Sequence, residues 1–211
     1  MDMARNMSLA VERSFPHSKK VIDRFHVVRL VMDAMQHLRV KLRWQAIEDE
    51  NNAVKGAKQR GEKYYPPLLS NGDTVKELLV RGRYLLYKFE EDWTANQSQR
   101  AAILFEKYPI LQKAYKLTLA FRAIYKAQSK EKALLWFDSW KREIQEAQIA
   151  EFNTVVNSIE YHLGNILNFF NNRSTNGNAE SFNSKIKGFR ANLRGVTDVS
   201  FFLFRLQKLF A

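Results

Sequence analysis

One segment near the end of the sequence carries side chains whose types and spacing could act on nucleic acid. Glu180, Lys187 and Arg194 are seven residues apart, so on a helix they share one face, with Asn183 and Arg190 beside them. A carboxylate there could hold a metal ion while the cations beyond it contact phosphates. A carboxylate in a first turn is also favoured by the helix dipole alone. Spacing therefore leaves a metal-and-phosphate site and a solvated helix face both open.

The rest of this segment predicts the helix that such a site needs. An apolar stripe lies opposite the charged face and consists of Phe182, Ile186, Phe189 and Leu193. Several N-capping side chains precede it in Thr175-Asn176-Gly177-Asn178. We expect an amphipathic helix that packs its apolar face and presents its polar face.

Much of the remaining chain has helical periodicity, with only four prolines and eight glycines. One apolar face recurs from Val27 to Leu42, Pro109 opens another helix, and further helices are expected at about 130–147 and 152–170. The polar stretch 48–74 contains Tyr-Tyr-Pro-Pro and is the best candidate for a mobile connection. The expected fold is mainly α.

One short segment has a different character. Residues 19–23, Lys-Lys-Val-Ile-Asp, are partly β-branched and could form a single buried strand. A strand needs partners, and few other candidates are visible. This residual strand is a first indication that upstream structure has been lost.

Composition limits the classes of protein. A chain of 211 residues with 45% hydrophobic residues can build a core, and it has no run of about 18 apolar residues for a membrane span. The absence of cysteine excludes disulfides and thiolate zinc sites, which fits a cytoplasmic protein. The net charge of +12 favours a polyanionic partner such as nucleic acid, although an ordinary basic protein or one bound to ribosomes or anionic membranes has the same charge.

Two motifs make the nucleic-acid interpretation specific. Residues 174–187, Ser-Thr-Asn-Gly-Asn-Ala-Glu-Ser-Phe-Asn-Ser-Lys-Ile-Lys, resemble the T-N-G-x-x-E-x-x-N-x-x-I-K signature of bacterial DDE-type transposases of the ISL-three group of insertion sequences. Residues 21–28 resemble the D-R-F-H-V signature of the same family. Shorter matches occur in the family's order at 83–86, 114–117 and 201–206, so the resemblance covers nearly the whole chain.

The resemblance implies a ribonuclease-H-like catalytic core with three carboxylates, Asp, Asp and Glu, and a large helical insertion before the Glu. Residues 1–26 would then be a remnant of that core carrying the second Asp. Residues 27–172 would be the all-helical insertion, and residues 173–211 the C-terminal core helices carrying the Glu.

The resemblance also assigns the carboxylates. Glu180 matches the third acid, and Asp2, in Met1-Asp2-Met3, matches the second. Asp23 is the alternative second acid, and it is equally well placed to be a helix N-cap before Phe25. His26 lies near a histidine of related transposases, but by itself it reads better as a core or capping residue.

The implied chemistry is DNA cleavage and strand transfer with Mg²⁺ or Mn²⁺, for which Asp2 and Glu180 are the expected metal ligands. Lys187, Arg190 and Arg194, with Asn183, are expected to contact phosphates of the transposon ends. The first Asp and the DNA-recognition domain are expected upstream, so the chain alone should be inactive. Its expected partners are DNA and either a second copy or the full-length transposase. The alternative is a non-catalytic DNA-binding or transposase-inhibiting fragment.

Overall fold

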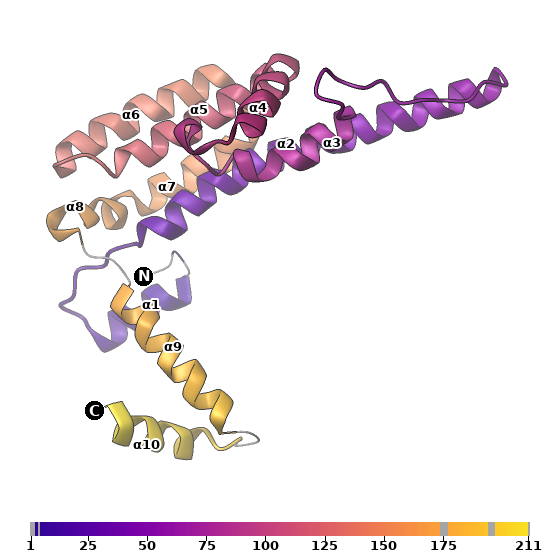
Figure 1. The fold of residues 1–211 in the computed structure, drawn as a ribbon. Helices are drawn as coiled ribbons and strands as arrows, with labels where there is room; N and C mark the ends of the chain where they lie inside the picture. Colours follow the sequence, from indigo (N-terminus) through magenta and orange to yellow (C-terminus); the bar gives the residue numbers. More distant parts are fainter. Residues whose placement is uncertain (1–2, 4, 174–176, 194–196, 211) are drawn as a thin grey trace.

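The computed structural model describes residue 3 and residues 5–173, 177–193 and 197–210 (Figure 1). Within these ranges the structure is helical and contains no strand. The elements in chain order are α1 (Arg5–Ser14), α2 (Arg24–Gln59), α3 (Val75–Leu85), the 3-10 turn η1 (Glu90–Asp92), α4 (Ala95–Lys107), α5 (Pro109–Ile124), α6 (Lys130–Ala147), α7 (Ala150–Leu167), α8 (Phe169–Asn172), α9 (Gly177–Asn192) and α10 (Val199–Phe210).

The long helix α2 is the spine of a helical body that extends from α2 to α8 (Figure 1). Helices α3, α5 and α7 pack against α2, while α4 packs on α3 and α5, and α6 on α5 and α7. The apolar face expected between residues 27 and 42 supplies the buried Val27, Val31, Met35 and Leu38. The helical periodicity of the first half of α2 is therefore confirmed as a core face.

Helix α2 also continues into the first part of the stretch expected to be a connection. Residues 48–59 belong to the helix, so the sequence prediction was wrong there. Lengthening an existing helix requires little free energy compared with starting a new one, because each added residue gains a hydrogen bond. The helix ends at Gln59. Gly61, just beyond it, adopts φ 74°, and the Glu62 N–H donates to the Ala57 carbonyl at 2.9 Å. This end of α2 projects beyond the other helices (Figure 1).

The residual strand expected at residues 19–23 is not present. A strand must hydrogen-bond to a neighbouring strand, and the described residues offer none. The Ile22 N–H instead donates to the Asn165 carbonyl of α7 at 3.2 Å, and the Ile22 side chain is buried in the helical core. The prediction that this segment is buried thus holds for Ile22, but the Ile22 backbone hydrogen-bonds to the end of a helix instead of to a strand.

Aromatic side chains fill the core between α5 and α6. Trp140 packs against Phe121 with ring centroids 4.7 Å apart, and its Nε1–H donates to the Leu117 carbonyl at 2.8 Å. Both helices lie where the sequence predicted them, with Pro109 at the first turn of α5. None of the described helices combines the length and the apolar character that a bilayer span requires.

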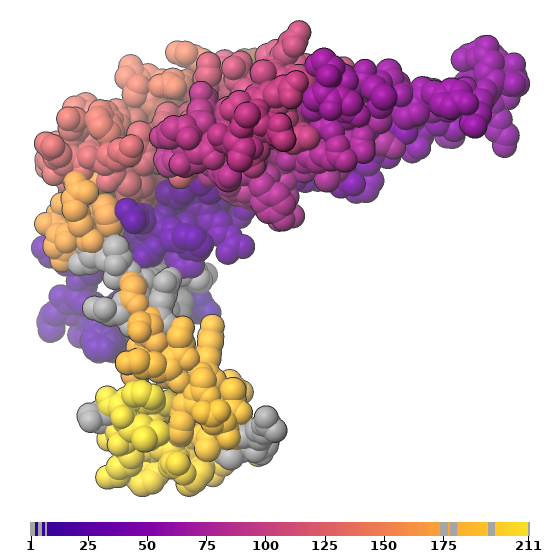
Figure 2. Space-filling view, viewed as in Figure 1, coloured from indigo at the N-terminus to yellow at the C-terminus, as the bar shows by residue number. Residues whose placement is uncertain are grey.

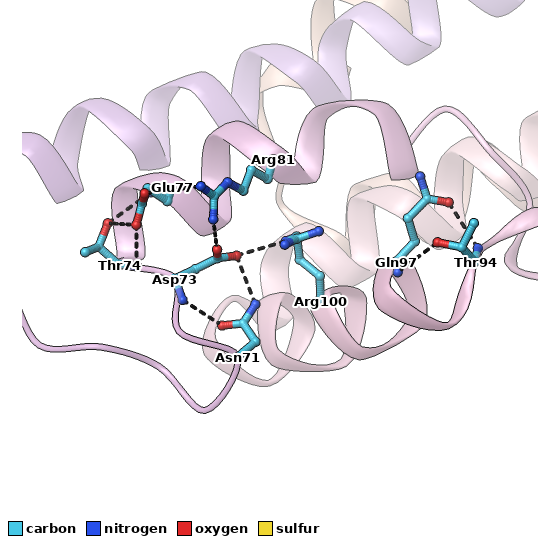
Figure 3. Close-up of polar contacts among 8 residues, drawn as sticks. All are labelled: Asn71, Asp73, Thr74, Glu77, Arg81, Thr94, Gln97 and Arg100. Atoms are coloured by element: carbon cyan, nitrogen blue, oxygen red, sulfur yellow. Dashed lines mark hydrogen bonds and ion pairs between the residues drawn. The ribbon is translucent and has the colours of Figure 1, made fainter.

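The buried carboxylate of Asp73 anchors the loop that connects α2 to α3 (Figure 3). Asp73, whose side chain is 1% exposed, pairs with Arg81 of α3 and accepts from Arg100 Nε of α4 at 2.9 Å. Asn71 Nδ2 donates to the same carboxylate at 2.9 Å. Capping boxes begin both helices, formed by Thr74 with Glu77 in α3 and by Thr94 with Gln97 in α4.

Helices α9 and α10 form a hairpin that lies apart from α2–α8 (Figure 2). Their packing is aromatic: the rings of Phe182 and Phe210 are 5.5 Å apart, and those of Phe189 and Phe202 are 5.9 Å apart. The buried core has no described member beyond Phe170. The hairpin is therefore held by its own contacts rather than by the core of the body.

Candidate functional site

Helix α9 separates its apolar and polar faces as its sequence predicts. Phe182 and Phe189 face α10, while Asn183, Lys187 and Arg190 are exposed to solvent. This separation follows from the 3.6-residue period. The amides and cations of α9 are thus accessible to a ligand as large as a nucleic acid.

The structure describes only part of the expected catalytic set. Glu180 is the fourth residue of α9, and its backbone is described but its side chain is not. Asp2 and Arg194 lie outside the described residues. Among the described side chains, no three His, Asp or Glu form a group that could hold a metal ion.

Asp23 acts as the N-cap of α2. Its carboxylate accepts the Phe25 N–H at 2.7 Å, and the residue is 7% exposed. Burial raises the pKa of the neighbouring Tyr125 hydroxyl, and the charge of Asp23 raises it further. The capping role that the sequence suggested is therefore present, whereas a catalytic role for Asp23 stays a prediction. His26 is half-buried, with its ring 5.8 Å from that of Phe25.

The two chain segments that lead to the expected carboxylates meet at one end of the body. Asn168 Nδ2 donates to the Lys20 carbonyl at 2.9 Å, beside the hydrogen bond from Ile22 to Asn165. Arg173 Nη2 donates to the Ala127 carbonyl at 2.7 Å, which holds the end of α8 on the same body. The residues before α2 and the end of α7 are thus brought together although about 145 positions separate them.

The sequence pattern assigns no role to a group of arginines between α2 and α3. Arg39 and Arg43 are one turn apart on α2, and Arg39 lies among its buried residues. A cation at successive turns beside the apolar stripe from Val27 to Leu42 was the available signal. The prediction missed it because helix arginines are usually solvated.

Comparison with known proteins gives one finding. A family model described as "Transposase", that of the DDE transposases of the ISL-three group, matches residues 1–206. No curated protein and no solved structure matches the chain.

Proposed function

The chain belongs to the DDE transposases of the ISL-three group, and on this premise we propose that it provides part of the site that cleaves and joins DNA at transposon ends. The chemistry would be metal-dependent phosphodiester cleavage followed by strand transfer.

The observation that carries this proposal is the meeting of the two segments at one end of the body. The hydrogen bonds from Asn168 to Lys20 and from Ile22 to Asn165 place the end of α7 beside the approach to α2. A helical unit with adjacent ends can be inserted between two parts of another domain without separating them. This supports residues 27–172 as an insertion between a ribonuclease-H-like segment at 1–26 and one at 173–211.

The metal ligands we assign are Asp2 and Glu180, with Asp23 as the alternative second acid. Carboxylate oxygens are the hard donors that Mg²⁺ and Mn²⁺ prefer, so this donor set fits such an ion. A divalent ion held there would stabilise charge on the phosphodiester during cleavage. Glu180 is the fourth residue of α9, and acidic residues near the start of a helix are favoured by its dipole.

The DNA contacts we assign on α9 are Lys187, Arg190, Arg194 and Asn183. The described members of this group are exposed and lie opposite the face that packs on α10. Phosphate contacts of this kind position DNA without reading its sequence. The chain's charge of +12 supplies the general attraction.

The test is cleavage of transposon-end DNA by the complete transposase that contains this chain. We expect Glu180→Gln to lower the cleavage rate by at least about 100-fold, because loss of even an outer-shell partner of a metal site costs 10–100-fold. DNA affinity should change little, since the carboxylate contacts the metal. Glu146→Gln, at an exposed position of α6, is the matched control.

Normal cleavage by Glu180→Gln would show that this carboxylate is not catalytic. DNA binding that ignores Mg²⁺, without cleavage by the wild-type transposase, would favour the non-catalytic binding or inhibiting role. Asp2→Asn and Asp23→Asn, compared in the same assay, would identify the second acid.

A further inference from the structure

Three arginines converge on the seam between α2 and α3. Arg39 and Arg43 lie on the same side of α2, one helical turn apart. Gln36, one turn before Arg39, connects them to α3: its Oε1 accepts from Arg39 Nε at 2.6 Å, and its Nε2 donates to the Arg83 carbonyl at 3.3 Å. Gln36 thus ties Arg39 to the backbone of Arg83, and the charges of Arg43 and Arg83 both act on Arg39.

The described residues supply no counter-charge for this cluster. Arg39 is 7% exposed, and its hydrogen bonds go to neutral acceptors, Gln36 and, at 2.7 Å, the Leu79 carbonyl. Arg43 Nε is buried and has no hydrogen-bond partner. No described carboxylate forms an ion pair with Arg39, Arg43 or Arg83, whereas Arg81 and Arg100 share Asp73.

The energetics of this arrangement favour a bound anion. Burial lowers the pKa of Arg39, and the neighbouring charges of Arg83 and Arg43 lower it further. Buried charges in proteins are normally paired, because removing a cation from water is costly. Arg83 is exposed and can extend its head group to solvent, whereas Arg39 is buried and forms no ion pair with a described acid.

Phosphate is the anion whose chemistry fits best. The guanidinium group presents a planar fork of donors that matches phosphate oxygens in a bidentate manner. The seam also has an open side: Arg83 lies over the ring of Tyr84 at 5.4 Å, and Tyr84 is 67% exposed. A phosphate at the surface of α3 can therefore reach Arg83, the exposed member of the cluster.

We propose that Arg39, Arg43 and Arg83 bind a backbone phosphate of DNA, at a site distinct from the cations of α9. This inference rests on the proposed function for the identity of the polyanion. It assigns a role to the Arg83-Tyr84 motif, and it places part of the DNA path on the helical body, which is otherwise only an insertion. Figure 1 shows α3 and α9 in separate parts of the molecule.

The experiment measures duplex DNA binding by the 211-residue chain at several salt concentrations. We expect Arg43→Gln and Arg83→Gln each to weaken binding about tenfold, the value of one charge-assisted contact. Each should also lower the slope of log K against log salt by about 1. The matched control is Arg142→Gln, an equal charge change at an exposed position of α6, which should alter neither quantity appreciably.

Thermal unfolding separates a ligand role from a structural role. We expect Arg43→Gln and Arg83→Gln to unfold at or above the wild-type temperature without ligand, since each removes a charge that lacks a partner. Inorganic phosphate should raise the unfolding temperature of the wild type more than that of either variant. At Arg39 the variant to test is Arg39→Lys rather than Arg39→Gln. Glutamine would remove the buried hydrogen bonds of Arg39, so a loss of stability could not be separated from a loss of binding.

The possible results lead to distinct conclusions. Variants that bind DNA like the wild type, with an unchanged salt slope, would overturn the proposal. Protection by inorganic phosphate with unchanged DNA affinity would show that the cluster takes a free anion, which also overturns it. A wild-type chain that binds no DNA would also overturn the proposal. The proposed function would still be tested separately, by comparing DNA cleavage by the complete transposase with cleavage by its Glu180→Gln variant.

Discussion

At the scale of single residues, Asp73 shows how one carboxylate can organise a region rich in cations. Burial by itself would raise the pKa of Asp73, but hydrogen bonds and charges from Arg100 and Arg81 outweigh burial and lower it (Figure 3). Because the folded pKa is lowered, the ion pairs stabilise the fold above the unfolded pKa of about 3.9. That stability is lost as the pH falls through the folded pKa.

We predict that Asp73→Asn lowers the free energy of unfolding by about 2–4 kcal/mol at pH 7. The substitution leaves two arginines without their shared acceptor, and the estimate allows for their partial exposure to solvent. Urea unfolding at pH 7 and at pH values below about 4 would measure it, with the difference from wild type shrinking on acidification. Asp138→Asn on the exposed side of α6 is the control, and an equal loss there would refute the specific role of Asp73.

At the scale of elements, the ends of helices are set by local backbone chemistry. Gly72 adopts φ 79° in the turn before α3, where its N–H donates to the Leu69 carbonyl at 2.8 Å. A residue with a Cβ is strained in that left-handed region. Gly164 instead lies inside α7, and a Cβ there would meet no atom within 4 Å.

Substitution of the two glycines by alanine is therefore expected to change the free energy of unfolding in opposite directions. Gly72→Ala should lower the free energy of unfolding by about 1 kcal/mol through strain. Gly164→Ala should raise it by up to about 1 kcal/mol, because alanine loses less conformational freedom in a helix. Chemical denaturation of both variants measures this, and a change of the same sign in both would contradict the assignment of the turn.

At the scale of the whole molecule, the helical body and the C-terminal hairpin have separate sources of stability. The described core reaches Phe170 and includes nothing from α9 or α10. The hairpin exposes much of its apolar surface, including Phe201, Leu203 and Phe204.

Deleting residues 174–211 is expected to change the free energy of unfolding of the body by less than about 0.5 kcal/mol, because no described core contact is lost. Deleting residues 161–211 should unfold the body, since that also removes the buried Ile166, Leu167, Phe169 and Phe170. Circular dichroism with urea titration distinguishes the two truncations. A body that unfolds after the shorter deletion would show that the hairpin is part of its core.

The helices and the family could be predicted from the amino-acid sequence. Periodicity placed the apolar faces of α2, α5, α6 and α9, because a 3.6-residue repeat needs no knowledge of distant contacts. The T-N-G-x-x-E and D-R-F-H-V motifs indicated the transposase family that the match over residues 1–206 establishes. The capping role of Asp23 was also foreseen, since a cap contacts only neighbouring residues.

Features that depend on packing between distant segments became visible only in the folded chain. It showed that residues 19–23 rest on α7 instead of pairing as a strand, because a strand is defined by its partner. It also brought Lys20 beside Asn168 and placed Arg39 and Arg43 near Arg83 on another helix. No local pattern encodes such meetings, since they arise from the crossing of whole helices around a shared core.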